Sequence, residues 1–364
     1  MSEGLPSSHP EQQYLEQELC SACSLPPRRD NKGDGIPLRK CMRCHSAQYH
    51  DAACQRLHYP KHKNICRNIG VGSIGQKISS NPHTRHVIRA PYRIQDGPSK
   101  GKCMLANIEI TAGQSIGNPE EFAPLAAPVL FEGHRSSRCA CCFSTQVDCN
   151  VGDDKRYIAH LCRSCVNTDH AESLRREVHA VGMSTQIPRI LATAILVYRI
   201  CVRVLSNARD WEWVSCMISH PILQEDPNAV VHQKAIVMTV LTMLGTTGQS
   251  MDIDRITGIL SRIKVNAFTI TDSNGESLGI GLYRTSHYIN HCCSPNTRQS
   301  FLVGIAGCVP KLKLTSTTTI QEGEEITISY VDTCGLTGNE RRKQLLQSYH
   351  FLCECPTCQH ESKT

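Results

Sequence analysis

The chain has 364 residues, 40% of them hydrophobic, which is enough for two or three domains with sizeable cores. Lysine and arginine exceed aspartate and glutamate by six, and this excess lies within residues 20–67. The 22 cysteines would suit a disulfide-rich secreted protein, but the N-terminus carries no basic-then-apolar signal and many cysteines stand in Cys-x2-Cys pairs. These features predict zinc binding in a reducing compartment, cytoplasmic or nuclear, rather than a disulfide scaffold.

Residues 1–19 form a polar segment. Residues 20–66 carry eight Cys and His side chains at zinc-ligand spacing, with too few apolar residues for a core of their own. Because structural zinc takes four such ligands, the pattern predicts two zinc ions, whose binding would supply the folding energy. His45 and His58 are alternative ligands, which we expect to be exposed to solvent.

The order and spacing of these ligands resemble a MYND zinc finger, a protein-interaction module. The resemblance implies interleaved sites, with one ion held by Cys20, Cys23, His50 and Cys54 and the other by Cys41, Cys44, His62 and Cys66. The basic charge of the finger suggests an acidic partner, which we expect to be a protein; binding of nucleic acid is compatible but not required. A solvated basic face is the plainer alternative.

Residues 67–90 are predicted to be a linker. Alternating apolar residues around Gly113 predict the first strands of a domain over residues 91–138. Residues 139–170 then hold two Cys-x2-Cys pairs, which predict a zinc site made of Cys139, Cys142, Cys162 and Cys165. The competing ligands are Cys141, Cys149, His160 and His170, and free thiols in a loop are the alternative to metal binding.

Residues 171–264 are predicted to be helical. Apolar residues recur at spacings of three and four over residues 172–181, 188–205, 229–244 and 252–264. The most apolar of these segments contains Arg189, Arg199 and Arg203, so we expect a helix of a globular domain and not a membrane span.

The most informative stretch covers residues 278–296. It contains Gly279-x-Gly281-Leu282-Tyr283 and then Asn290-His291-Cys292-Cys293-Ser294-Pro295-Asn296. Downstream follow Gly323-Glu324-Glu325 with an alternating apolar segment that ends at Tyr330, and the tail motif Cys353-x-Cys355-x2-Cys358. These motifs, in this order, resemble the SMYD branch of the SET-domain protein lysine methyltransferases. A zinc loop around Cys293 without catalysis is the alternative interpretation.

The resemblance implies an α+β fold: a β-rich SET domain with knot-like C-terminal threading, a helical insert and small zinc-stabilised modules. Its catalytic core would cover residues 265–352, residues 171–264 would form one wall of the substrate cleft, and residues 353–364 would form the post-SET zinc segment. Cys293 would share a zinc ion with Cys353, Cys355 and Cys358, which makes about four zinc ions in the chain.

The activity implied is methyl transfer from S-adenosylmethionine to a lysine of a protein, histone or non-histone. By matching position, Tyr330 would orient the amine and Tyr349 would line the lysine channel. The cofactor would contact Lys100, Gly101, Lys102, Asn266, Asn290, His291, Tyr330 and Phe351. Cys103 stands where the family's cofactor loop commonly has a second glycine. If its side chain crowds the cofactor, the second hypothesis is an inactive SET-fold scaffold or transcriptional adaptor that acts through the finger.

Overall fold

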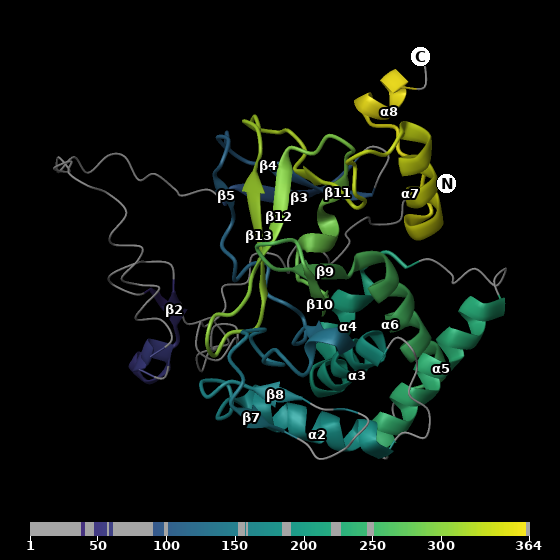
Figure 1. The fold of residues 1–364 in the computed structure, drawn as a ribbon. Helices are drawn as coiled ribbons and strands as arrows, with labels where there is room; N and C mark the ends of the chain where they lie inside the picture. The colour runs from purple at the N-terminus through teal and green to yellow at the C-terminus, as the bar shows by residue number, and fades with distance from the viewer. Residues whose placement is uncertain are drawn as a thin grey trace, which may run out of the picture. The chain divides into compact units, whose positions relative to one another are not determined.

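A computed structural model describes residues 38–40, 47–56, 58–60, 90–97, 101–151, 157, 159–183, 191–219, 227–245 and 251–361 (Figure 1). The contacts divide the chain into two compact units, Met1–His86 and Val87–Thr364. The residues of the predicted finger fall in the first unit and the SET-like motifs in the second. Within the described part of the chain, no helix has the length and apolar character that a membrane span needs.

The first unit contains an antiparallel pair of short strands, β1 (Arg39–Lys40) and β2 (Gln48–Tyr49). Residues 52–56 are helical, and Asp51 caps this turn because its carboxylate accepts a hydrogen bond from the backbone N–H of Cys54. Tyr49 is buried, and its hydroxyl lies 3.0 Å from Nδ1 of His58. His58 is therefore half-buried against this tyrosine rather than fully exposed.

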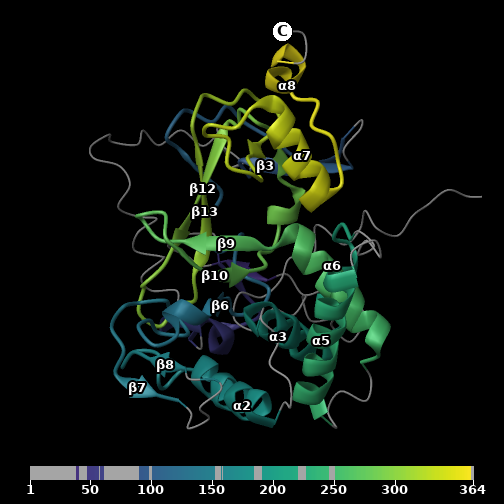
Figure 2. The ribbon, with the colours of Figure 1, turned by 45° about the vertical axis from the view of Figure 1, so that its right-hand side comes forward.

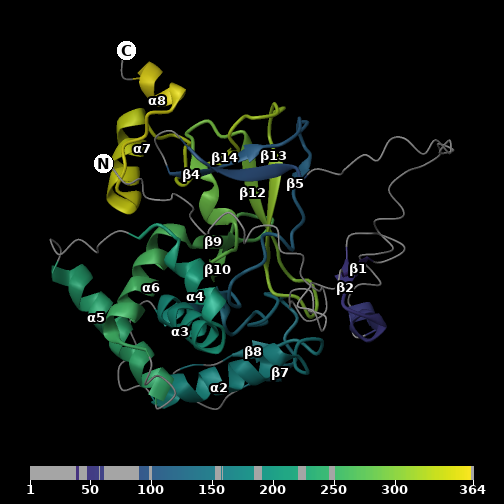
Figure 3. The same cartoon turned by 180° about the vertical axis from the view of Figure 1, so that it is seen from behind.

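The second unit is built on short strands that form several small sheets (Figure 3). They are β3 (Tyr92–Asp96), β4 (Lys102–Ala106), β5 (Ser115–Ile116), β6 (Val129–Leu130), β7 (Cys149–Asn150), β8 (His160–Leu161), β9 (Phe268–Thr271), β10 (Ser277–Gly281), β11 (Asn290–His291), β12 (Thr297–Leu302), β13 (Lys311–Ser316) and β14 (Thr327–Ile328). Strand β13 lies between β12 and β5, and β10 lies between β6 and β9. Strands β12 and β13 form an antiparallel hairpin, and alternate residues of β13 are buried, as expected when one face of a strand covers the core.

Strand β10 requires a glycine at its centre. A Cβ atom at Gly279 would lie 2.2 Å from the carbonyl oxygen of Val129 in β6, which is far inside contact distance. The sequence motif around Gly279 therefore permits the close approach of two strands.

The helices between residues 169 and 266 gather on one side of the strands, with β9 and β10 next to them (Figure 2). They are α2 (Asp169–Met183), α3 (Leu191–Ser206), α4 (Ala208–Ser215), α5 (Pro227–Leu244) and α6 (Ile253–Asn266). Four of them were predicted from apolar spacing. Helix α4 was not, because Asp210 and Val214 are its only buried residues.

Two helices, α7 (Gly338–Tyr349) and α8 (Pro356–Glu361), carry the tail of the chain. Helix α7 begins with a capping box, in which the side chains of Thr337 and Glu340 satisfy each other's backbone N–H groups. It ends at His350, whose left-handed conformation (φ 59°) turns the chain toward the tail cysteines.

Strand β11 pairs in parallel with β14, so that Asn290 lies opposite Thr327 and His291 opposite Ile328. The segment before Tyr330 therefore lies beside the Asn290–His291 loop, as the sequence predicted. One apolar core lies among the strands, and a second joins the helices to the cysteines of residues 139–165. This mixture of helices, sheets and cysteine clusters confirms the predicted α+β class.

Candidate active site

A cavity of about 600 Å³ opens beside β9, β11 and β14. Pockets for small molecules commonly measure about 300–1,000 Å³. Six of the residues predicted to bind the cofactor or act in catalysis line this cavity, although they come from segments far apart in the sequence. They are Asn266, Asn290, His291, Tyr330, Tyr349 and Phe351.

Three hydrogen bonds hold Tyr330 in the wall of the cavity. Its hydroxyl donates to the carbonyl oxygen of Ile289 at 2.7 Å, and its backbone N–H donates to Nδ1 of His291 at 3.0 Å. The hydroxyl of Tyr349 donates to the Tyr330 carbonyl at 3.3 Å, and the two rings lie 4.8 Å apart. Burial, assisted by Tyr349 and Glu325, raises the pKa of Tyr330 above its ordinary value. The hydroxyl therefore stays protonated at neutral pH.

Asn290 is oriented by Glu325, whose Oε1 accepts a hydrogen bond from Asn290 Nδ2 at 2.7 Å. Asn296 joins the same strand pair, because it donates to the Glu325 carbonyl and accepts from the backbone N–H of Thr327 at 2.9 Å. Neither Glu325 nor Asn296 was predicted as a site residue. Both residues belong to the sequence motifs, so the sequence indicated their place near the site but not the residues with which they form hydrogen bonds.

Asn266 and Phe351 approach the cavity from α6 and from the tail. The amide nitrogen of Asn266 donates to the carbonyls of Arg262 and Ile218, both at 2.8 Å, and these bonds fix the orientation of its side chain. The ring of Phe351 lies edge-to-face with Tyr330, with the centroids 6.4 Å apart. The cavity wall thus contains an amide side chain and an aromatic surface.

Two further lining residues, His287 and Gln299, were not predicted from the sequence. Both ring nitrogens of His287 and Oε1 of Gln299 are buried and lack a hydrogen-bond partner in the described structure. Burial, with a contribution from the charge of Lys102, lowers the pKa of His287 to about 4, so its ring is neutral at pH 7. Because buried polar groups are normally paired, these atoms fit a site that is completed by a polar molecule.

The structure describes only part of the predicted cofactor loop before β4. Lys100 lies outside the described residues, and the exposed Gly101 and Lys102 are not among the residues that line the cavity. The thiol of Cys103 lies 3.5 Å from the carbonyl oxygen of Gln95, its neighbour on β3. Cys103 is likewise not among the described residues that line the cavity.

The tail cysteines form a buried cluster with the central loop. The sulfur atoms of Cys293, Cys353, Cys355 and Cys358 all lie within 4.8 Å of one another, and Cys293 is 3.5 Å from Cys358. Zinc with Zn–S bonds of about 2.3 Å needs tetrahedral edges of about 3.8 Å, so the four thiols fit this ion. Arg341 of α7 lies beside Cys293 and Cys358, and it donates hydrogen bonds to Glu361 at 2.8 Å and to the carbonyl oxygen of Leu336. The sequence analysis missed Arg341, which would partly neutralise a thiolate cluster.

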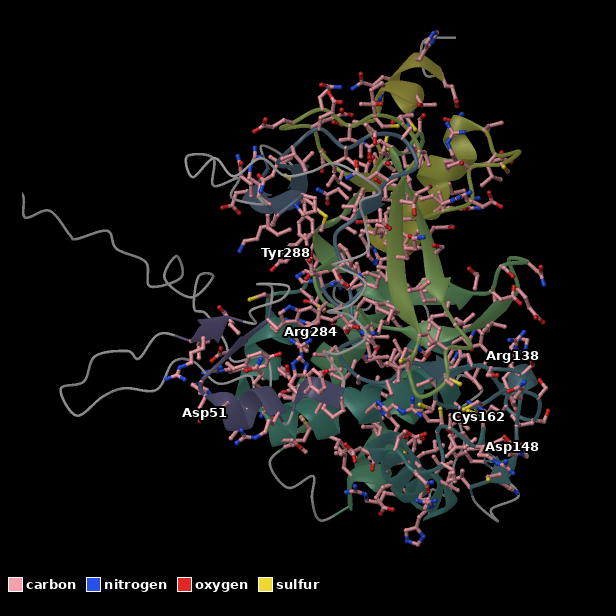
Figure 4. All side chains as sticks on the ribbon, turned by 90° about the vertical axis from the view of Figure 1, so that its left-hand side faces the viewer. Asp51, Arg138, Asp148, Cys162, Arg284 and Tyr288 are labelled. Carbon is pink, nitrogen blue, oxygen red and sulfur yellow. The ribbon has the colours of Figure 1, made fainter. Side chains whose placement is uncertain are left out.

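The cysteines of residues 139–165 form a second buried cluster of the same kind (Figure 4 labels Cys162). The sulfur atoms of Cys139, Cys142, Cys162 and Cys165 meet within 4.8 Å, and none of the competing ligands joins this described group. The hydrogen bond between Cys139 and Cys142 lowers the pKa of Cys139 and raises the pKa of Cys142, so the two thiols share a proton. The loop between β12 and β13 is tied to this cluster, because the backbone N–H of Gly304 donates to the Cys142 carbonyl at 2.7 Å.

The predicted finger ligands are described only in part. Nδ1 of His50 lies 3.9 Å from the sulfur of Cys54, a separation that two ligands of one ion can have. The other six predicted ligands lie outside the described residues: Cys20, Cys23, Cys41, Cys44, His62 and Cys66.

Helix α4 supports the segment that leads into the cavity. The carboxylate of Asp210 is buried and accepts hydrogen bonds from Arg284 at 2.6 Å and Arg203 at 2.7 Å. Arg284 lies two residues before the lining residue Ser286 and is labelled in Figure 4. Trp213 of α4 stands edge-on to the ring of His287, with centroids 5.1 Å apart. Trp213 therefore packs on the cavity wall.

Comparison with known proteins gives the class of this chain. The family profile described as SET domain matches residues 101–331. The mouse protein named Histone-lysine N-methyltransferase Smyd1 is 29% identical over 277 residues, which are 71% of this chain and 54% of that protein. The mouse Histone-lysine N-methyltransferase SMYD3 is 38% identical over 103 residues, which are 28% of this chain and 22% of that protein.

The solved structure described as the SET domain of LSMT bound to lysine and AdoHcy covers 73% of this chain and 54% of its own. Its 12% identity and TM-score of 0.39 are too low to support an argument. The family profile covers more than half of the chain, so the chain belongs to the SET-domain family. Both named relatives are SMYD proteins, the branch that the sequence motifs resemble, and the chain spans about half the length of the relative Smyd1.

Proposed function

We propose that the chain is an S-adenosylmethionine-dependent protein-lysine N-methyltransferase whose MYND-type finger binds a protein partner. The observation that carries this proposal is the fixed, protonated hydroxyl of Tyr330 in the wall of a cavity that also contains Asn290 and His291. The names of the SMYD relatives support the same reaction class. The substrate is a lysine-bearing protein, histone or non-histone, met in the cytoplasm or the nucleus.

The cavity is large enough for the cofactor, and its described wall contains buried polar atoms that lack a hydrogen-bond partner and that the cofactor could satisfy. Asn266 and Asn290 would hold its polar groups, His291 lines the cavity beside them, and Phe351 offers a flat apolar surface for its base. S-adenosylmethionine supplies a methyl group on a sulfonium, which is already activated for transfer. The tasks left to the protein are binding, exclusion of water and alignment.

The lysine must arrive as a neutral amine. Its ordinary pKa is about 10.4, so deprotonation at about pH 7.4 costs about 4 kcal/mol. The aromatic wall formed by Tyr330, Tyr349 and Phe351 lowers this cost, because low polarity disfavours the ammonium form. Since the Tyr330 hydroxyl donates to Ile289, its oxygen is left to accept an N–H of the amine and to set its direction.

The scaffold hypothesis rested on crowding by Cys103. The thiol of Cys103 is directed toward Gln95, and the described cavity wall does not include it. This arrangement favours the enzyme over the scaffold.

Tyr330→Phe tests the proposal. With labelled S-adenosylmethionine and a cell extract, the full chain should label protein lysines, and the variant should lose labelling on the order of 100-fold while cofactor affinity changes only a few-fold. Tyr283→Phe is the matched control, because Tyr283 is also buried and its hydroxyl also donates to a main-chain carbonyl, that of Pro310 at 3.2 Å. Equal labelling by wild type and Tyr330→Phe, or absence of cofactor binding by the wild type, would overturn the proposal.

A further inference from the structure

The ring of His291 joins two parts of the molecule with different roles. His291 is 3% exposed, its Nδ1 lies 3.0 Å from the backbone nitrogen of Tyr330, and its Nε2 lies 3.3 Å from the sulfur of Cys293. One neighbour lines the cavity and the other belongs to the tail cysteine cluster. A single buried side chain therefore spans from the candidate zinc site to the candidate catalytic residue.

The geometry selects one tautomer of this ring. A backbone N–H can only donate, so Nδ1 accepts from Tyr330 and carries no proton. In the neutral ring the proton is then on Nε2, and it points at Cys293. A cysteine that ligates zinc is a thiolate, which is a good acceptor for this N–H. The tautomer that Tyr330 requires is the same one that a metal-bound Cys293 favours.

The two hydrogen bonds that Tyr330 donates both end on the same short stretch of chain. Its hydroxyl is held by the carbonyl of Ile289 and its backbone N–H by the ring of His291. The same stretch ends at Cys293, whose sulfur lies 3.5 Å from that of Cys358. Any change that shifts Cys293 is therefore transmitted to Tyr330 through residues 289–293.

From these contacts we infer that His291 is a positioning residue, through which metal bound at the tail cysteines fixes the placement of Tyr330. The inference deepens the proposed function and rests on it for its consequence in catalysis. Zinc would hold Cys293 as a thiolate, the thiolate would hold the Nε2–H, and the oriented ring would hold the backbone of Tyr330. A Cys293 without metal is a weaker acceptor, so the ring would be less firmly oriented.

The tautomer can be measured in the wild-type full chain without any assay of methyl transfer. Two-dimensional ¹⁵N NMR of the histidine rings should show His291 with its proton on Nε2. After replacement of zinc by ¹¹³Cd, the Nε2 proton should show a coupling to the metal through the N–H···S hydrogen bond, which the non-magnetic isotope ¹¹²Cd should remove. A proton on Nδ1, or no coupling in a cadmium-loaded chain, would overturn the inference.

A pair of substitutions separates the two hydrogen bonds. His291→Asn keeps an acceptor near the position of Nδ1 but has no donor that reaches Cys293, whereas His291→Gln keeps a donor near Nε2 and loses the acceptor for Tyr330. Loss of a hydrogen bond to a metal ligand typically lowers metal affinity about 10–100-fold. We expect this loss at the tail site in His291→Asn, with zinc retained within a few-fold in His291→Gln.

Zinc release to chelators of graded strength would measure these affinities, with Cys358→Ala identifying the ion that belongs to the tail. The Tyr330 amide resonance should move in both His291 variants and in Cys358→Ala. Equal zinc affinity in Asn and Gln variants, or an unmoved Tyr330 amide in all of them, would refute the coupling. These results are independent of turnover, so they would not be confused with failure of the methyltransferase proposal.

Discussion

Replacement of Asp210 by Asn tests whether α4 holds the cavity in shape from outside. The Asp210 side chain is 3% exposed, and its carboxylate accepts hydrogen bonds from Arg284 at 2.6 Å and from Arg203 at 2.7 Å. Asparagine has nearly the same shape but no charge, so the substitution leaves the packing, removes the ion pairs and replaces one acceptor oxygen by an N–H donor among the donors Arg284, Arg203 and Asn207. The effect should appear both in stability and in cofactor binding, because Arg284 leads into the cavity-lining residues Ser286 and His287.

The expected loss follows from the two ion pairs. A hydrogen bond to a charged group contributes about 1.5–3 kcal/mol to stability. The side chains of Arg284 and Arg203 are 34% and 50% exposed, so solvent screening places each bond at or below the lower end of this range. We expect the free energy of unfolding to fall by about 2–3 kcal/mol at pH 7.

Urea denaturation with tryptophan fluorescence is the appropriate assay, because both tryptophans of the chain, Trp211 and Trp213, lie on α4. Glu212→Gln is the matched control: it removes a negative charge from the same helix at an exposed position, and it should change stability by less than about 0.5 kcal/mol. If Asp210→Asn and the control lose equal stability, or if cofactor affinity is unchanged in Asp210→Asn, α4 does not support the site in this way.

The same ion pairs predict a pH dependence. Although burial opposes it, hydrogen bonding from Arg284 and Arg203 lowers the pKa of Asp210 below its ordinary value. A carboxylate whose pKa is lowered by folding contributes stability above its unfolded pKa of about 3.9, and this stability disappears as the pH falls through the folded pKa. The difference in unfolding free energy between wild type and Asp210→Asn should therefore be constant from about pH 8 to about pH 5 and shrink below about pH 4.

Two further predictions concern metal and cofactor. Metal analysis of the purified full chain should give about four zinc ions per chain, since each site takes four ligands, and two or fewer would contradict the site of residues 139–165 and at least one other. Cys103→Gly should leave the affinity for S-adenosylmethionine within about twofold. The thiol of Cys103 faces Gln95, so its removal should open no space beside the cofactor. Calorimetry that showed clear tightening in Cys103→Gly would mean that Cys103 does crowd the cofactor.

Much of the site could be predicted because its residues lie inside local motifs. Asn290, His291 and Tyr330 line one cavity, as their resemblance to the family implied, and the cysteines of each described quartet meet although they are separated by up to 65 residues. Ligand spacing carries part of this information, since a Cys-x2-Cys pair supplies two of the four ligands that structural zinc takes. Helices with a continuous apolar stripe, such as α3 and α6, were predictable for a similar reason.

The parts that escaped prediction depend on contacts between distant polar residues. Helix α4 has no apolar stripe, and its attachment through Asp210 to Arg284 spans 74 positions that no periodicity connects. The role of Arg341 beside the tail cysteines and that of Glu325 beside Asn290 are of the same kind. A charged residue in a helix is usually solvated, so its sequence gives no sign that it is buried against a partner.

Residues 284–293 have little structure of their own, which explains why they are held from three directions. They comprise a single turn of 3₁₀ helix over Ser286–Tyr288 and the two-residue strand β11, and neither is stable in isolation. Thr285 has a φ of 66°, a left-handed conformation that is strained for a β-branched residue and persists only where neighbours enforce it. Asp210 holds the segment at Arg284, β14 holds it at Asn290 and His291, and the tail cluster holds it at Cys293. Because these supports act on one stretch of ten residues, changes in α4 or in the tail should alter the cavity without touching a residue that lines it.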